Sequence, residues 1–403
     1  MKAVGIVVEY NPFHNGHHYQ AKQARQETDS DVVIAVMSTS FLQRGEPAIV
    51  SKWTRTQMAL ANGIDIVVEL PYLYATQKAE LFAEGAVSIL HGMGVSALHF
   101  GSESGKITDF IKLVDTMNEQ APKLDPLIRL YMNQGFSYPK ASSKAFSDLS
   151  LETQGLSLTE PNNILGFHYV KTIKEKYKSI QPETTLRIKA HYHEETISSD
   201  SIASATSIRK AIQEGATIEN LKHVIPKETL VALNDYYSYY INFHTWDCYF
   251  PLLQYKIMTS TIEQLRLIYE CEEGLEYRIK ETIREAESFS DWMTKLKTKR
   301  YTWTRLQRLA VHILTNTSKE TIANGLSTKL PYIQLLGLTK NGQAYLSASR
   351  KIRQTELLTK RAKATGIVAH LEEKATSVYI QPLQPKKRIE ALRQEYQGPI
   401  ILK

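Results

Sequence analysis

The chain opens with a buried strand that runs directly into a polar, glycine-bearing turn. Residues 3–8 form a nearly unbroken apolar and β-branched run, which is typical of a strand buried on both faces of a parallel sheet. Asn11 and Pro12 end this run, because proline donates no hydrogen bond to a strand ladder and disfavours helix in the residue before it. A helix-compatible stretch begins near Gly16. The sequence therefore predicts that the His-Asn-Gly-His box at residues 14–17 lies at a strand-to-helix junction.

Such a junction favours the binding of an anion. The first-turn amides of a helix have no partner within the helix, and the helix dipole adds partial positive charge. Two imidazoles there, His14 and His17, can donate hydrogen bonds to a phosphate as charge develops during its displacement. Gly16 between them lets a base or ribose approach the backbone. The alternative is a turn with two solvated histidines.

Strands alternate with helices through the first part of the chain. The strands are expected at residues 31–37, 66–70 and 97–100, and the helices at 52–62 and 79–90. This alternation predicts an α/β fold with a doubly wound parallel sheet, in which ligands bind beyond the carboxyl ends of the strands. Gly101 follows one strand directly and could lie against a nucleotide, or it is an ordinary turn glycine.

Two later segments carry further candidates. Residues 201–209 form a small-residue loop that enters a helix, where backbone amides, the Ser207 hydroxyl and the Arg209 guanidinium could hold the β and γ phosphates. The alternative is a capped surface helix. Asn162 begins a helix that extends to residue 176, and it could cap that helix or reach a ribose or adenine.

Beyond about residue 220 the apolar spacing becomes helical. We expect an α/β domain over residues 1–220 and a mainly α-helical, basic domain over residues 221–403. The second domain contains a cationic stretch with interleaved aromatic residues, which suits phosphate contacts and base stacking, although charge runs are often only solvated surface. The candidate residues for nucleic-acid contact, which the resemblance described below makes RNA contact, are Lys295, Lys297, Lys299, Arg300, Arg305 and Arg308.

Composition limits the class of protein. The formal net charge is +7, and its uneven distribution suggests an anionic partner. Only two cysteines occur, too few for a disulfide framework or a four-cysteine zinc site, and the start of the chain does not resemble a secretory leader. No apolar run approaches the length of a membrane span, so we expect a cytoplasmic protein without a membrane role.

The box at residues 14–17 and Ser-Ala-Thr-Ser-Ile-Arg at 204–209 resemble the nucleotidylyltransferase superfamily, which has a Rossmann-like fold. With the segments 43–48, 52–53 and 160–165, the chain resembles more narrowly the family of bacterial tRNA(Met) cytidine acetate ligases. One position departs from the superfamily pattern, since Ala205 stands where a serine is usual.

This resemblance implies a reaction and a set of site residues. Acetate would attack the α-phosphate of ATP to give acetyl-adenylate and pyrophosphate, and N4 of the wobble cytidine (position 34) of elongator tRNA(Met) would then take the acetyl group, forming N4-acetylcytidine. Mg²⁺ is expected with the ATP. The implied catalytic residues are His14, His17, Ser207 and Arg209. The implied ATP-binding residues are Val7, Val8, Glu9, Tyr10, Asn11, Pro12, Phe13, His14, Asn15, Gly16, His17, His18, Tyr19, Gln20, Gly101, Asn162, Arg187 and Ile188.

Two other functions fit the same motifs. A nucleotidylyltransferase that makes a dinucleotide cofactor would share the first 210 residues, but it would hardly require the basic helical extension. A non-catalytic, nucleotide-dependent RNA-binding protein would keep both parts. The residues around the acetate and the oligomeric state stay open at this point.

Overall fold

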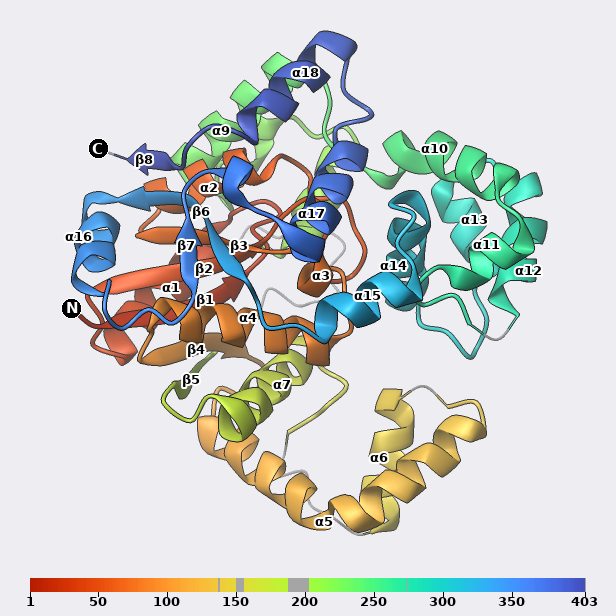
Figure 1. Ribbon diagram of the computed structural model, residues 1–403, viewed down its shortest axis with the longest axis horizontal. Coiled ribbons are helices and arrows are strands. Elements are labelled where there is room, and N and C mark those ends of the chain that lie inside the picture. Colours follow the sequence, from red (N-terminus) through yellow and green to blue (C-terminus); the bar gives the residue numbers. More distant parts are fainter. Residues whose placement is uncertain (137, 150–155, 188–202, 273, 403) are drawn as a thin grey trace.

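The fold is built on one twisted sheet with helices on both faces (Figure 1). The computed structural model describes residues 1–136, 138–149, 156–187, 203–272 and 274–402. The sheet has eight strands in the order β5-β4-β1-β2-β3-β6-β7, with β8 also paired to β6. The strands are β1 Ala3–Val8, β2 Val32–Ser38, β3 Ile66–Leu70, β4 Ala97–Ser102, β5 Gln181–Leu186, β6 Tyr332–Thr339, β7 Glu356–Leu358 and β8 Ile400–Leu402.

Helices follow the strands throughout the chain. The α-helices are α1 Asn15–Glu27, α2 Lys52–Ala61, α3 Tyr72–Ala75, α4 Ala79–Met93, α5 Ile107–Asn133, α6 Tyr138–Asp148, α7 Pro161–Lys176, α8 Ala205–Gln213, α9 Lys227–Tyr240, α10 Trp246–Thr259, α11 Ile262–Leu267, α12 Leu275–Thr282, α13 Phe289–Leu296, α14 Trp303–Leu314, α15 Lys319–Leu326, α16 Lys340–Ala348, α17 Gly366–Tyr379 and α18 Pro385–Gln394. Short 3-10 helices are η1 Ile218–Leu221, η2 Ile283–Glu285 and η3 Arg361–Lys363.

The predicted parallel sheet is confirmed for the first five strands. β1 pairs in parallel with β2 and with β4, β2 with β3, and β4 with β5. Every residue of β2 and β3 is buried, as expected for strands covered on both faces. Apolar side chains of α1, α2, α8 and α9 pack on one face, and those of α3, α4, α7 and α17 contribute to the core on the other.

The C-terminal part is mainly helical, as predicted, but it also returns to the sheet. β6 pairs antiparallel with β3, so the sheet is mixed although mostly parallel. The apolar spacing of residues 221–403 does not predict β6. Its sequence contains Leu335, Leu336 and Gly337, which do not favour a strand on their own, and the open edge of β3 decides its conformation. The division of the chain at residue 220 remains a prediction.

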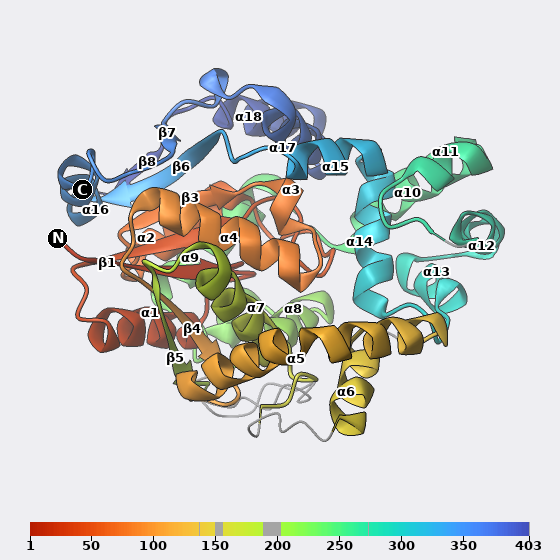
Figure 2. The ribbon, with the colours of Figure 1, turned by 60° about the horizontal axis from the view of Figure 1, so that its bottom comes forward.

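The helices α10 to α13 form a group at the opposite end of the molecule from α16 (Figures 1 and 2). Helices α5 and α6 form a hairpin that reaches outward at the same end in both views. In the described residues no helix is long and apolar enough to cross a membrane.

Candidate active site

The candidate site lies where the chain changes direction across the sheet. After β1 the chain places β2 on one side of it, and β4 later pairs on the other side. In open α/β sheets ligands bind beyond the strand ends at such a point. The His-Asn-Gly-His box follows β1 here and starts α1, so the predicted strand-to-helix junction is confirmed.

Hydrogen bonds fix the orientation of both histidine rings. His14 is the N-cap of α1, and its Nδ1 accepts the backbone N–H of Gly16 at 3.0 Å. The Nδ1 of His17 accepts the backbone N–H of His14 at 3.3 Å. The two rings stack with centroids 3.8 Å apart. Because a neutral imidazole has one donor and one acceptor nitrogen, these bonds leave the proton of each ring on Nε2.

The electrostatics of the site keep both rings neutral. Burial lowers the pKa of His14 to about 3, and the positive charges of Arg187 and Arg209 act in the same direction. Burial, followed by the proximity of His14 and Arg187, lowers the pKa of His17 well below its ordinary value. Near neutral pH the site therefore offers two uncharged Nε2–H donors at a helix N-terminus, which suits a phosphate oxygen on which charge develops.

The loop before α1 is held by distant parts of the chain. The side-chain oxygen of Asn11 accepts the backbone N–H of Ile49 at 2.6 Å. The backbone N–H of Asn15 donates to the carbonyl of Val224 at 3.1 Å, and its side-chain amide donates to the carbonyl of His223 at 3.1 Å. These contacts fix the position of the box relative to the sheet.

Arg209, which the sequence predicts to hold phosphates, lies beside this loop. One of its amino groups donates to the carbonyl of Asn11 at 2.9 Å, and the other forms an ion pair with Glu46 at 2.6 Å. Ser207 lies in the first turn of α8, where its hydroxyl donates to the carbonyl of Ser204 at 2.9 Å. Arg209 is thus at the site, whereas the Ser207 hydroxyl already bonds within its own helix. No local pattern indicates Glu46 as the partner of Arg209.

Three predicted nucleotide-binding residues meet on the other side of the site. A guanidinium nitrogen of Arg187 donates to the side-chain oxygen of Asn162 at 3.2 Å. A Cβ on Gly101 would lie 3.1 Å from Cγ of Arg187, so glycine permits this close packing. Ile188, predicted with them, lies outside the described residues.

Asn162 does not cap α7, which was one of the two interpretations of this residue. Its side-chain amide donates to a carboxylate oxygen of Glu103 at 2.6 Å, and the other oxygen of Glu103 accepts the backbone N–H of Asn163 at 2.8 Å. Glu103 therefore takes the capping role from the turn after β4. Sequence reasoning missed Glu103, although it stands two residues after Gly101.

The remaining predicted ATP-binding residues are consecutive from β1 into α1, but they differ in how far they are exposed to solvent. Phe13 has no exposed surface, and its ring packs 4.7 Å from that of Tyr10 and 5.6 Å from that of His17. The Phe13 side chain therefore supports the box, and a contact of this residue with ATP stays a prediction. Those with some exposed surface include Val7, Glu9, Asn15, Gly16, His17, His18, Tyr19 and Gln20, whereas Val8, Tyr10, Asn11, Pro12 and His14 are buried.

Several side chains of the cationic stretch are paired with acids, which its sequence did not suggest. Arg308 is buried and pairs with Glu270 at 2.8 Å. Lys295 pairs with Asp291 at 2.8 Å and Arg305 with Glu272 at 3.0 Å. The acids that neutralise Arg305 and Arg308 come from another segment, so inspection of the stretch alone missed them. The burial of Arg308 counts against it as an RNA contact, while Lys299 and Arg300 are exposed and Lys297 is half-buried.

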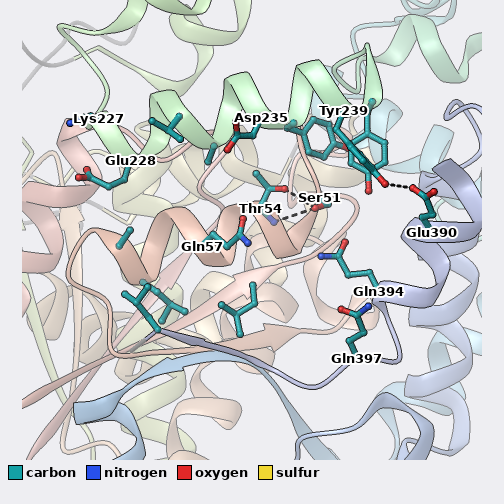
Figure 3. A pocket seen from close by; sticks show the side chains of 18 residues that line it. Ser51, Thr54, Gln57, Lys227, Glu228, Asp235, Tyr239, Glu390, Gln394 and Gln397 are labelled. Carbon is teal, nitrogen blue, oxygen red and sulfur yellow. Dashed lines mark hydrogen bonds between the residues drawn. The ribbon is translucent and has the colours of Figure 1, made fainter.

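A separate cavity of about 770 Å³ lies between α2, α9, α18 and β8 (Figure 3). Its charged lining residues are Lys227, Glu228, Asp235 and Glu390. Three carboxylates against one ammonium repel a triphosphate or an RNA backbone. None of the residues of the box lines this cavity, so we do not assign the nucleotide to it.

A metal ion bound at this site would take most of its ligands from the substrate. Within the described ranges no group of three or more His, Cys, Asp or Glu side chains is arranged to hold a metal ion. Mg²⁺ is commonly bound by substrate phosphates and one or two carboxylates. Glu46, which pairs with Arg209, is a carboxylate on the side of the site where the phosphates are predicted.

The fold and the box define a class of protein. The sequence model of the family HIGH Nucleotidyl Transferase matches residues 1–395, and the chain belongs to this family. It is 51% identical over 399 residues to the tRNA(Met) cytidine acetate ligase of Bacillus licheniformis, covering 98% of this chain and 96% of that protein. It is 46% identical over 399 residues to the tRNA(Met) cytidine acetate ligase of Bacillus subtilis strain 168, again covering 98% and 96%.

Solved structures with the same architecture include Thermotoga maritima TmcAL. The apo crystal form has a TM-score of 0.92 and 30% sequence identity to this chain, with all of both chains covered. A second crystal form, bound with alpha-thio ATP, has a TM-score of 0.90 at the same identity and coverage. The likeness thus extends over the helical C-terminal part as well as the sheet.

Proposed function

We propose that this chain is an ATP-dependent ligase that activates acetate as acetyl-adenylate and acetylates N4 of the wobble cytidine of elongator tRNA(Met). The observation that carries the proposal is the pair of neutral Nε2–H donors of His14 and His17 at the N-terminus of α1, in a chain that shares its full length with tRNA(Met) cytidine acetate ligases. ATP is the nucleotide, in keeping with the analogue bound to the Thermotoga maritima protein.

In the first half-reaction an acetate oxygen attacks the α-phosphorus of ATP, and the bond to the bridging oxygen of pyrophosphate breaks. Negative charge grows on the phosphate oxygens as this happens. The Nε2–H groups of His14 and His17 donate to those oxygens, and their fixed orientation means that little reorganisation is needed at the moment of reaction. No covalent intermediate with the protein is required.

The pyrophosphate leaves toward α8. The N-terminal amides of that helix and the Arg209 guanidinium offer donors there, so Arg209 exchanges part of its contact with Glu46 for the phosphates. Mg²⁺, when bound, neutralises part of the phosphate charge. The adenosine lies toward Gly101, Asn162 and Arg187, which are already in contact with one another.

The second half-reaction explains why ATP is used. The cytosine amine is conjugated with its ring and is a poor nucleophile, so it needs an activated acyl group. The wobble base lies in a loop, where it can be splayed into a pocket without opening a long duplex. Lys297, Lys299 and Arg300 are the members of the cationic stretch that we propose as RNA contacts.

Incubation with ATP, labelled acetate and a panel of tRNAs tests this function. We expect acetate-dependent exchange of pyrophosphate into ATP without RNA, and label transfer to elongator tRNA(Met) only. A nucleotidylyltransferase that makes a dinucleotide would instead consume ATP with a phosphorylated small substrate. A non-catalytic RNA-binding protein would release no pyrophosphate, and this result would exclude a ligase.

A further inference from the structure

The residues toward which we place the adenosine do not lie on the side of β1 that faces β2. Gly101, Asn162 and Arg187 lie on or beside β4 and β5, on the other side of β1. On the β2 side, Glu9 follows β1 and its carboxylate accepts the backbone N–H of Gln43 at 2.8 Å. Gln43 belongs to the loop between β2 and α2. The adenosine contacts therefore leave this side of β1 to an acyl acceptor, once the pyrophosphate has departed.

The loop that carries Gln43 contacts two helices of the C-terminal part, α10 and α14. Gly45 has φ 78°, and a Cβ there would lie only 2.4 Å from the backbone nitrogen of Arg308 in α14. The carbonyl of Gly45 also accepts the indole N–H of Trp246 at 3.0 Å. Since α14 begins at Trp303, three residues after Arg300, this loop connects the site with the surface we assign to RNA.

In the described part of the chain, the Glu9 carboxylate forms fewer hydrogen bonds and ion pairs than the carboxylates of Glu46 and Glu103. Glu46 is committed to Arg209, and Glu103 accepts N–H groups of Asn162 and Asn163. Among the described residues, the Glu9 carboxylate has one hydrogen bond, from Gln43, and no ion pair within 4.0 Å. It retains acceptor capacity for a substrate proton.

The backbone at Glu9 is nevertheless rigid. The fully buried guanidinium of Arg55 donates to the carbonyl of Glu9 at 2.7 Å and to that of Ser38 at 2.7 Å, so it joins the carboxyl ends of β1 and β2. It also donates to the carbonyls of Val50 and Thr39. A general base must be held within reach of its proton, and this network supplies that constraint.

We propose that Glu9 is the general base of the acyl-transfer step, and that the acceptor cytosine enters on the β2 side of β1. The inference rests on the proposed function. N4 of the cytosine attacks the acetyl carbonyl carbon, the carbon–nitrogen bond forms, and the carbon–oxygen bond to AMP breaks with its electron pair remaining on the phosphate. The proton lost from N4 moves to the Glu9 carboxylate and later to water.

The surroundings of Glu9 favour this role. Burial raises the pKa of Glu9, while the hydrogen bond from Gln43 and the charges of Arg44 and Arg209 oppose the rise and the charge of Glu46 adds to it. In the part of the chain that the structure describes, Arg55 and Tyr169 also interact with Glu9 electrostatically. A carboxylate with a raised pKa is a stronger base, and proton transfer is more efficient as the pKa approaches the working pH.

Glu9→Gln tests the inference, with two rates measured on the same preparation. One is acetate-dependent ATP–pyrophosphate exchange without RNA, and the other is single-turnover transfer from preformed acetyl-adenylate to tRNA(Met). We expect the transfer rate to fall on the order of a hundredfold more than the exchange rate. Glu84→Gln, at a surface ion pair with Lys176, is the matched control and should change neither.

A pH profile separates a base from a structural residue. The wild-type transfer rate should fall on the acid side as Glu9 is protonated, and Glu9→Asp should keep this acid limb, whereas Glu9→Gln should lose it. Equal loss of exchange and transfer, or an acid limb unchanged in Glu9→Gln, would overturn the assignment. Absence of acetate-dependent exchange in the wild type would reject the proposed function itself. Wild-type exchange together with unimpaired transfer in Glu9→Gln would reject only the role of Glu9.

Discussion

The imidazole rings of His14 and His17 stack 3.8 Å apart, and each accepts a backbone N–H through Nδ1. The capping of α1 and the tautomers of the two rings are therefore the same set of contacts. The contacts that start the helix also make Nε2 the donor atom of each ring, at a helix N-terminus that attracts an anion.

We predict that His17→Ala lowers acetate-dependent turnover by on the order of a hundredfold or more, because it removes a donor that acts on charge formed in the transition state. The Michaelis constant for ATP should change much less than the turnover number. Steady-state pyrophosphate exchange measures both values. His370→Ala, on the exposed surface of α17, is the control, and unimpaired turnover in His17→Ala would remove the box from the mechanism.

His14 carries two roles that substitutions can separate. Asparagine is a good N-cap, so His14→Asn should keep the stability of α1 while losing the Nε2–H donor. His14→Ala should lose activity and also about 1 kcal/mol of unfolding free energy. Urea unfolding together with the exchange assay distinguishes the variants. Full activity of His14→Asn would show that only the cap matters.

Replacing Lys297, Lys299 and Arg300 with glutamate should weaken tRNA binding while acetate-dependent pyrophosphate exchange continues. Each lost phosphate contact removes a counterion-release contribution, so the salt dependence of binding should become less steep. Binding titrations at several salt concentrations measure this. The same charge change at Lys178, Lys329 and Lys340, all exposed, is the control, and equal weakening by both triple variants would indicate only a general effect of net charge.

Arg308 should behave as a structural residue. Its side chain and that of Glu270 are 9% and 11% exposed, so Arg308→Met leaves a nearly buried carboxylate without its partner. We expect a loss of about 3 kcal/mol or more in unfolding free energy. The double variant with Glu270→Gln should recover much of that loss, as urea unfolding will measure. If Arg308→Met were as stable as the wild type, Arg308 would again be a candidate RNA contact.

Acid should destabilise the fold through its buried histidines. Both ring nitrogens of His244 are hydrogen-bonded, to the hydroxyls of Tyr236 and Tyr249 at 2.8 and 2.6 Å, and burial lowers its pKa to about 3. The unfolded chain, with a histidine pKa near 6.5, binds more protons below that pH, so stability is complete above about 6.5 and is lost as the pH falls toward 3.

The expected loss is about 2 kcal/mol per such histidine at pH 5. Urea unfolding at pH 7 and pH 5 measures it, and His244→Gln should show a smaller difference between the two. An identical pH dependence in wild type and variant would contradict the assignment of His244 as a buried neutral group.

The sequence by itself determined the strand at residues 3–8, the box after it and the helix that follows. These depend on the spacing of apolar residues, a proline and a helix start, which are properties of neighbouring residues. The same local patterns predicted β2, β3 and β4 and therefore the parallel part of the sheet. They also placed Arg209 among the site residues before any contact was known.

Tertiary structure alone decided which side chains the site residues meet. Arg209 bonds to Glu46, Asn162 to Glu103, and Arg308 to Glu270, and the partners are 163, 59 and 38 residues apart in the sequence. The strand β6 likewise forms because the edge of β3 offers it hydrogen bonds. Local preferences in the chain carry no information about a partner that only folding brings near, so a pairing of charges or an added strand is fixed by the packed sheet and its helices.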